Sequence, residues 1–144
     1  MDAAGTAPAR HFVTVKAAVW AGERLLLVRE ETGAGAITVD LPGGRLECDE
    51  SLEDGLRREI REELGVELRS VPTLPVKLWT TRTPDGIGVV GLIYEAQLAS
   101  LGFDHSGADE VIGAEFLTYT ELLAAPGGLH KPYIVEYFTE ARRR

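Results

Sequence analysis

The sequence has little of what marks several common classes of protein. Its single cysteine, Cys48, excludes a disulfide framework and a zinc site built from cysteines. Its longest apolar runs, such as residues 25–28, are too short to span a bilayer, so no membrane association is expected. Residues 1–10 lack a basic start followed by an apolar stretch, so no secretory signal is expected either.

Basic residues are also scarce. The chain has 15 Lys and Arg against 23 Asp and Glu, and its net charge is −8. Binding to the backbone of a nucleic acid polymer needs a basic surface, so such a partner is not expected. A small anionic ligand remains compatible with this charge if a metal cation lies between it and the protein.

The length and composition of the chain fit one folded domain. The chain has 144 residues, of which 44% are hydrophobic and 26% charged. This composition provides a core and excludes a disordered or collagen-like chain. We expect a flexible tail over residues 1–10 and a single domain over residues 11–144, located in the cytoplasm.

The hydrophobic pattern predicts more strands than helices, in a mixed α/β domain of the α+β kind. A helix is expected over residues 51–64, with Ser51 as its N-cap, an apolar stripe starting at Leu52, and Gly65 as its left-handed end. Shorter helices are expected over residues 120–125 and 133–143. Strands are expected over residues 11–21, 24–29, 37–41, 87–98 and 111–117, with strand-like stretches broken by prolines over residues 66–82.

Acidic residues gather in and before the first of these helices. Residues 47–63 contain eight acidic and three basic residues. At about 100° per residue, Glu59, Glu62 and Glu63 border the apolar stripe, whereas the three arginines, Arg58 among them, fall on the face most open to water. Carboxylates three and four residues apart repel one another, and a divalent cation would remove that conflict. A solvated acidic helix is the alternative.

A sharp bend is expected just before this helix. The sequence there is Leu41-Pro42-Gly43-Gly44, and two glycines allow a close approach of the backbone. A hard cation takes only oxygen ligands, and such a glycine carbonyl can be one of them. The bend and the glutamates together suggest metal-assisted cleavage of a phosphoanhydride.

Residues 44–66 closely resemble the Nudix box. Its pattern is Gly, five residues, Glu, seven residues, Arg-Glu, an aliphatic, one residue, Glu-Glu, one residue, Gly and an aliphatic. All nine specified positions match, from Gly44 to Val66. The family often has glycine directly before the first glutamate, where this chain has Asp49, so the bend there is open to question.

The resemblance implies a Nudix fold, in which a mixed β-sheet lies between helices, and hydrolysis that depends on Mg²⁺, with Mn²⁺ as a substitute. It implies that Glu59 and Glu63 are the main metal ligands and that the Gly44 carbonyl is another. Glu62 would be a ligand or the base that activates water, and Glu62 and Glu63 count as catalytic residues.

Other residues are given supporting or peripheral roles by the resemblance. Arg58 would pair with Glu50 and hold the loop on the helix, with Gly43 shaping the bend. Arg29 resembles a position that touches substrate phosphate, and a surface arginine is the alternative. Glu110 resembles a loop glutamate that acts as a third ligand or general base, with Asp109 as a competitor.

The implied activity is hydrolysis of a nucleoside diphosphate linked to another group. A short, single-domain chain resembles the members that attack nucleoside triphosphates, including oxidised ones. An ADP-ribose or nucleotide-sugar pyrophosphatase is the first alternative, and a module that senses a nucleotide without cleaving it is an alternative of another class. The expected partner is therefore a small nucleotide, and a homodimer is left open.

Overall fold

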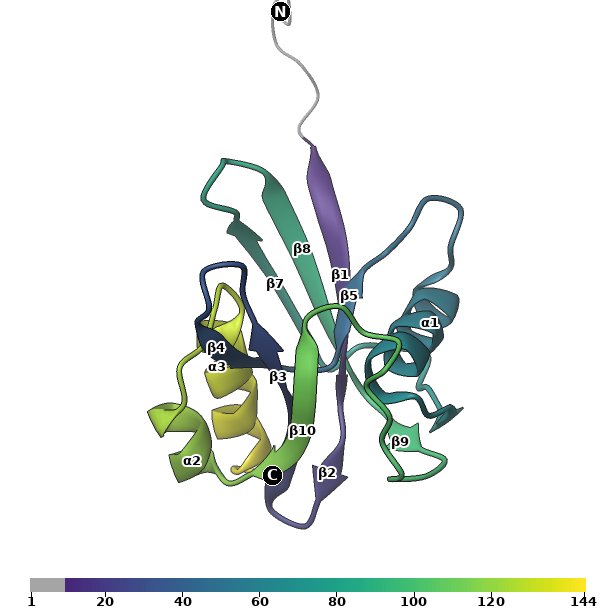
Figure 1. Ribbon diagram of the computed structural model, residues 1–144, viewed down its shortest axis with the longest axis vertical. Coiled ribbons are helices and arrows are strands. Elements are labelled where there is room, and N and C mark those ends of the chain that lie inside the picture. Colours follow the sequence, from purple (N-terminus) through teal and green to yellow (C-terminus); the bar gives the residue numbers. More distant parts are fainter. Residues whose placement is uncertain (1–9) are drawn as a thin grey trace, which may run out of the picture.

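The computed structural model describes residues 10–144, so almost all of the tail predicted over residues 1–10 lies outside the described residues. Three helices are present: α1 (Leu52–Leu64), α2 (Tyr119–Ala124) and α3 (Lys131–Ala141). The strands are β1 (His11–Ala18), β2 (Trp20–Ala21), β3 (Arg24–Glu31), β4 (Ile37–Asp40), β5 (Gly43–Arg45), β6 (Leu68–Ser70), β7 (Lys77–Arg82), β8 (Gly88–Glu95), β9 (Gln97–Leu98) and β10 (Val111–Leu117) (Figure 1).

The strands form two four-stranded sheets and one short pair. The first sheet has the order β5-β1-β8-β7, and β1 and β8 pair in parallel while the other neighbours are antiparallel. The second has β10, β3 and β2 in antiparallel order, with β4 also paired to β3. The pair is β6 with β9. The first sheet is thus mixed, as predicted.

Helices cover the sheets on both sides, so the core has two halves. In Figure 1, α1 lies to one side of the strands and α2 and α3 lie to the other. Apolar residues of α1 pack with alternate residues of β1 and β3, including Leu26 and Val28. Their strand neighbours Leu25 and Leu27 pack with α2 and α3. This alternation along β3 is the normal period of a strand buried on both faces. The predicted sandwich of helices around a mixed sheet is confirmed.

Helix α1 begins and ends as its sequence predicts. The Ser51 hydroxyl accepts a hydrogen bond of 3.1 Å from the N–H of Asp54, and Gly65 has φ 67°. Leu52, however, is 39% exposed, so its predicted place in the buried stripe is wrong. Burial starts one turn later, at Gly55 and Leu56, because only from there does the helix meet the core.

The diglycine does not simply end a strand, as the sequence suggested. Gly43 to Arg45 form β5, which pairs antiparallel with β1. Gly43 has φ 137°, and a Cβ there would clash with the carbonyl oxygen of Val15, so only glycine lets the chain approach β1 this closely. Asp49 has φ 66°, the left-handed conformation that a glycine would also adopt.

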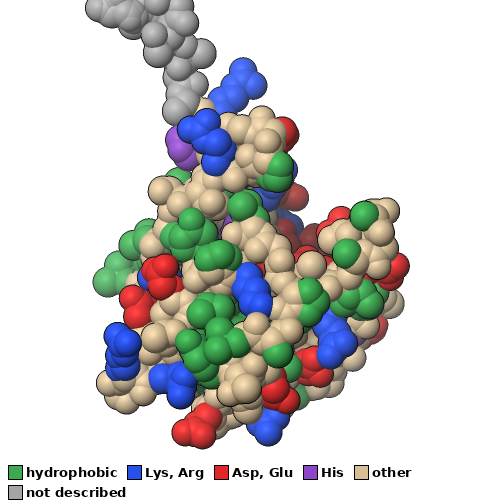
Figure 2. All heavy atoms as spheres, turned by 90° about the vertical axis from the view of Figure 1, so that its left-hand side faces the viewer, with side chains coloured by type: hydrophobic (Ala, Val, Ile, Leu, Met, Phe, Trp, Pro, Cys, Tyr) green, Lys and Arg blue, Asp and Glu red, His purple; other side chains and the backbone are tan. Residues whose placement is uncertain are grey.

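The face on the side of α2 and α3 carries basic, acidic and hydrophobic side chains intermixed, with no continuous basic area on it (Figure 2).

Within residues 10–144, no helix is both long and apolar enough to cross a bilayer.

Candidate functional site

Carboxylates from three parts of the chain meet in one cavity beside α1. The cavity has a volume of about 230 Å³. Its acidic side chains include five glutamates that we call the carboxylate cluster: Glu30, Glu59, Glu62, Glu63 and Glu110. The wall is completed by the loop from Gly107 to Asp109 and by Val111. The structure therefore brings the three box glutamates of α1 and the predicted loop glutamate together.

Glu30 belongs to the carboxylate cluster but was missed by the sequence analysis. It lies on β3 and lines the cavity with the glutamates of α1. The signal was available, because Glu30 continues the series Leu26, Val28 along one face of the strand. The predicted strand ended at Arg29, and for that reason the series was not followed further.

The diglycine lies directly against two box glutamates. The N–H of Gly43 donates a hydrogen bond of 2.8 Å to Oε1 of Glu63. A Cβ on Gly44 would lie 2.7 Å from the carboxyl carbon and both oxygens of Glu59. No larger residue at position 44 leaves room for Glu59 in this place, so the close approach expected of the diglycine is present.

Arg58 connects the loop before α1 to the cluster. Its Nε and Nη2 donate to the two carboxylate oxygens of Glu50 at 2.6 and 3.0 Å, and Nη2 also donates to the carbonyl of Arg45 at 3.0 Å. Its Nη1 donates to Glu59 at 2.9 Å and Glu62 at 3.2 Å. This bidentate hydrogen bond from Arg58 lowers the pKa of Glu50 to about 2.

The sequence placed Arg58 on the face most open to water, and that placement is wrong. The Arg58 side chain is only 19% exposed. The helical wheel locates the Cα, but an arginine side chain is long enough to fold back along the helix toward carboxylates on either side. The pairing with Glu50 determines its direction.

The carboxylate cluster contains more negative charge than its surroundings balance. Burial raises the pKa of Glu63 to about 8, although a nearby ammonium and a backbone N–H lower it. Burial is also the main reason why the pKa of Glu30 rises to about 7. The pKa of Glu59 is raised by burial, against the opposing effect of Arg58. Carboxylates that burial and mutual repulsion push toward protonation fit a site for a divalent cation.

The donor set is suited to a hard cation. Carboxylates and a glycine carbonyl are oxygen ligands, and Mg²⁺ in proteins commonly takes a few carboxylates together with waters and substrate phosphates. Among residues 10–144, however, no group of three or more acidic, histidine or cysteine side chains is placed so that it could hold a metal ion. Arg58 and the N–H of Gly43 bind the carboxylates of Glu59 and Glu63 instead.

Two other predicted residues lie differently with respect to the cavity. Asp109 lines it next to Glu110, so both candidates remain. Arg29 is on β3 next to Glu30, and successive residues of a strand face opposite sides. Its Nε donates to Glu115 of β10 at 2.9 Å. The structure does not bring Arg29 into the carboxylate cluster.

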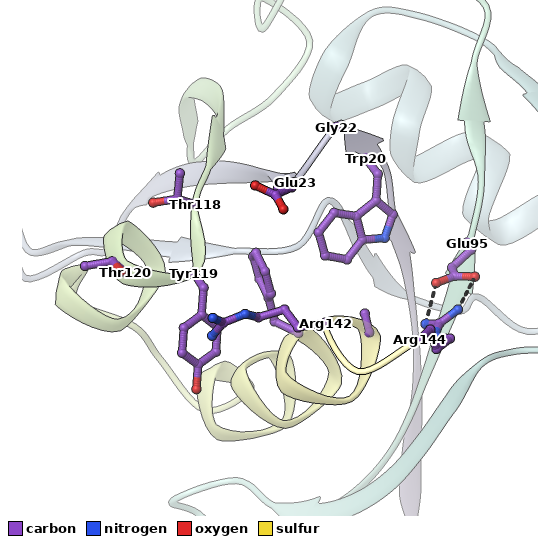
Figure 3. A pocket seen from close by; sticks show the side chains of 11 residues that line it. Trp20, Gly22, Glu23, Glu95, Thr118, Tyr119, Thr120, Arg142 and Arg144 are labelled. Carbon is purple, nitrogen blue, oxygen red and sulfur yellow. Dashed lines mark hydrogen bonds and ion pairs between the residues drawn. The ribbon is translucent and has the colours of Figure 1, made fainter.

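A second, larger cavity of about 670 Å³ lies near the C-terminal end of α3 (Figure 3). Trp20, Tyr119, Arg142 and Arg144 line it, and Arg144 pairs there with Glu95. None of the residues singled out in the sequence lies on its wall. The larger volume of this cavity therefore does not indicate that the reaction suggested by the box residues takes place there.

Comparison with known proteins agrees with this fold. A family model described as the NUDIX domain matches residues 10–138, and the chain belongs to the Nudix family. A NUDIX hydrolase from Nitrosomonas europaea superposes with a TM-score of 0.78 and 23% identity, covering 94% of this chain and 92% of that one. This likeness shows the fold.

Two curated relatives have a higher sequence identity to this chain. A MutT-like protein of Streptomyces ambofaciens is 36% identical over 93 residues, which are 64% of this chain and 55% of that protein. An ADP-ribose pyrophosphatase of Methanocaldococcus jannaschii is 27% identical over 110 residues, which are 76% and 63% of the two chains. The chain thus spans less than two thirds of the length of these relatives.

Proposed function

We propose that this protein is a metal-dependent pyrophosphohydrolase that cleaves the phosphoanhydride bond of a nucleoside diphosphate linked to another group. The observation that carries the proposal is the carboxylate cluster, packed against Gly43 and Gly44 and left with unbalanced negative charge. A structural surface would not partly bury Glu30, Glu59 and Glu63 beside one another, because their repulsion grows as water is excluded. A cation that also binds phosphate resolves the conflict.

In this proposal Glu59, Glu63 and the carbonyl of Gly44 hold the cation, with Glu62 as a further ligand or as the base. The cation is Mg²⁺, with Mn²⁺ as a substitute. When bound, it neutralises phosphate charge and favours attack by water. Arg58 keeps Glu59 and Glu62 oriented through its hydrogen bonds, and its pairing with Glu50 fixes Arg58 in turn.

The proton of the attacking water needs an acceptor. Glu62, Glu63 and Glu110 all line the cavity, and a general base must lie within hydrogen-bond reach of the proton it takes. Glu110 comes from the loop opposite α1, so it could act on a water held between the two walls. We retain these three as the proposed catalytic residues. Arg29 stays a proposed contact for a substrate phosphate, although it lies outside the cluster.

The proposed substrate is a nucleoside triphosphate or its oxidised form, as for a MutT-like enzyme. An ADP-ribose or nucleotide-sugar pyrophosphatase is the second candidate, because one relative bears that name. A sensor that does not cleave its ligand is less favoured, since every glutamate of the box is present. Location in the cytoplasm and the absence of a polymeric or membrane partner remain predictions, and a homodimer stays open.

A panel of substrates tests the proposal. Canonical and oxidised nucleoside triphosphates, ADP-ribose, nucleotide sugars and dinucleoside polyphosphates are incubated with Mg²⁺, and phosphate is measured after adding a pyrophosphatase. We expect turnover of one class, and a loss of about 10²-fold or more in E62Q and E63Q. The control is E53Q, on the same helix, where Glu53 is exposed and pairs only with Arg57. Turnover by E63Q at the wild-type rate would contradict the roles assigned.

Ligand binding without turnover separates the sensor from the enzyme. Mg²⁺ is expected to raise the Tm of the wild type, and the E59Q/E63Q double variant is expected to lose that shift. A Tm shift with no product from any member of the panel would identify a sensor. A protein that shows neither effect would be a scaffold with an acidic surface.

A further inference from the structure

A lysine lies buried directly behind the diglycine. Lys16 is near the middle of β1, and only 5% of its surface is exposed. Its Nζ donates to Oδ2 of Asp40 at 3.1 Å, to the carbonyl of Leu41 at 3.3 Å and to the carbonyl of Gly43 at 3.4 Å. Lysine is rarely buried to this extent unless it is paired, because removing an ammonium from water is costly.

An ion pair with Asp40 alone would not need the two carbonyl contacts. The carbonyls of Leu41 and Gly43 belong to the bend that leads into β5 and have been turned toward the same ammonium. Gly43 is consequently held at both ends, since its N–H donates to Glu63 and its carbonyl accepts from Lys16. The peptide before Gly43 is thus held by Glu63, and the peptide after it is held by Lys16.

Charge reinforces this arrangement. Burial lowers the pKa of the Lys16 ammonium, but the carboxylates of Asp40 and Glu63 raise it by more, so its net pKa lies above the ordinary value. Lys16 therefore stays protonated and keeps all three of its donor hydrogens. An ammonium has three donors, and the three acceptors described here match that number.

We propose that Lys16 is a positioning residue for the metal site: its ammonium holds the bend through the Gly43 carbonyl, so that the N–H of Gly43 stays on Glu63 and Gly44 stays packed against Glu59. The inference rests on the proposed function. Lys16 does not reach the cavity itself and acts only through the bend. Residues that orient metal ligands in this way commonly change metal affinity or activity by about 10–100-fold when replaced.

Whether K16M strengthens or weakens metal binding distinguishes a positioning role of Lys16 from an effect of its charge. Removal of a positive charge near the carboxylate cluster should tighten the binding of a cation, whereas loss of the donor that holds the bend should weaken it. We expect K16M to raise the Kd for Mn²⁺, measured by EPR of free Mn²⁺, by about tenfold or more. We also expect saturating Mn²⁺ to restore much of the lost kcat.

D40N is the matched control. It removes the charge of the ion pair and leaves Lys16 able to donate to both carbonyls, so its Kd for Mn²⁺ should change less than that of K16M. If K16M does not fold, the double variant K16M/D40N carries the same measurement, because it leaves no carboxylate without its partner. Far-UV circular dichroism and Tm in EDTA report on folding independently of the metal.

The outcomes distinguish this inference from the function on which it rests. A wild-type protein that binds no Mn²⁺ and turns over no substrate would overturn the proposed function. A wild type that does both, with K16M or K16M/D40N binding Mn²⁺ as tightly or more tightly, would overturn the role of Lys16 alone. Equal weakening in K16M and D40N would also overturn it, since the ion pair and not the bend would then be what matters.

Discussion

Arg58 donates two hydrogen bonds to Glu50 across the loop that leads into α1, from Nε to Oε2 at 2.6 Å and from Nη2 to Oε1 at 3.0 Å. The Glu50 side chain is only 14% exposed. The remaining nitrogen of Arg58 reaches Glu59 and Glu62. One guanidinium thus joins the loop to the carboxylate cluster.

Replacing Arg58 should therefore affect both stability and catalysis. R58Q loses the bidentate contact and leaves three carboxylates facing one another, so we expect Tm to fall by several degrees and kcat to fall by about tenfold or more. Thermal melts and steady-state kinetics measure the two effects. R61Q is the control, because Arg61 is exposed and pairs only with Glu67. An R58Q protein with the Tm of R61Q would count against the structural role.

Acid should weaken the Arg58–Glu50 contact. The pKa of Glu50 falls from 4.5 to about 2 because Arg58 binds the ionised form. A depressed folded-state pKa contributes stability that is present above the unfolded value and is lost as pH falls through the folded value. The Tm difference between wild type and E50Q should accordingly be constant above about pH 5 and shrink toward about pH 2. A difference that does not change with pH would refute this origin.

The metal-free protein should lose stability as the pH rises from about 5 to about 8. The pKa of Glu63 rises from 4.5 to about 8, so the folded state holds a proton that the unfolded state releases. Stability from such a group is complete below the unfolded value and is lost as pH rises through the folded value. In EDTA we expect Tm to fall between about pH 5 and pH 8 and to level off above that range, with a smaller fall in E63Q. Equal slopes in the two proteins would show that another group is responsible.

A side chain at position 44 should displace the Glu59 carboxylate. A Cβ there would lie 2.7 Å from the Glu59 carboxyl group, so G44A has to displace that group or the backbone. We expect G44A to weaken Mn²⁺ binding by about tenfold or more and to lower turnover in proportion. Titration of Mn²⁺ followed by EPR measures the affinity. G102A is the control, since nothing lies within 4 Å of a Cβ at Gly102, and it should behave as wild type.

The roles of the two loop acids, Glu110 and Asp109, can be distinguished by replacing each with its amide. Glu110 and Asp109 both line the cavity. If Glu110 is the general base, E110Q lowers kcat by about 10²-fold or more, with a smaller change in D109N. Steady-state kinetics with both variants at saturating Mg²⁺ test this expectation. The reverse order would assign the role to Asp109, and wild-type rates in both would leave Glu62 or Glu63 as the base.

Local sequence determined helix α1 and the residues it presents. The hydroxyl of Ser51, the left-handed Gly65 and the 3.6-residue period act within a few residues of one another, so they can be read without knowing the fold. The same holds for the turn at Gly86, where φ is 91°. The box pattern identified the family because its spacing reflects that one helix and the bend before it.

Only the tertiary structure decided what meets the helix. Glu30 enters the cavity because β3 extends past Arg29, and Lys16 lies behind the bend because β5 pairs with β1. Arg58 points toward Glu50, as the resemblance implied, and not toward water, as the helical period alone suggested. Caps and periodicity depend on neighbours along the chain, whereas burial and charge balance depend on segments that only folding brings together. For this reason the metal-site glutamates were visible in the sequence, and the charges that tune them were not.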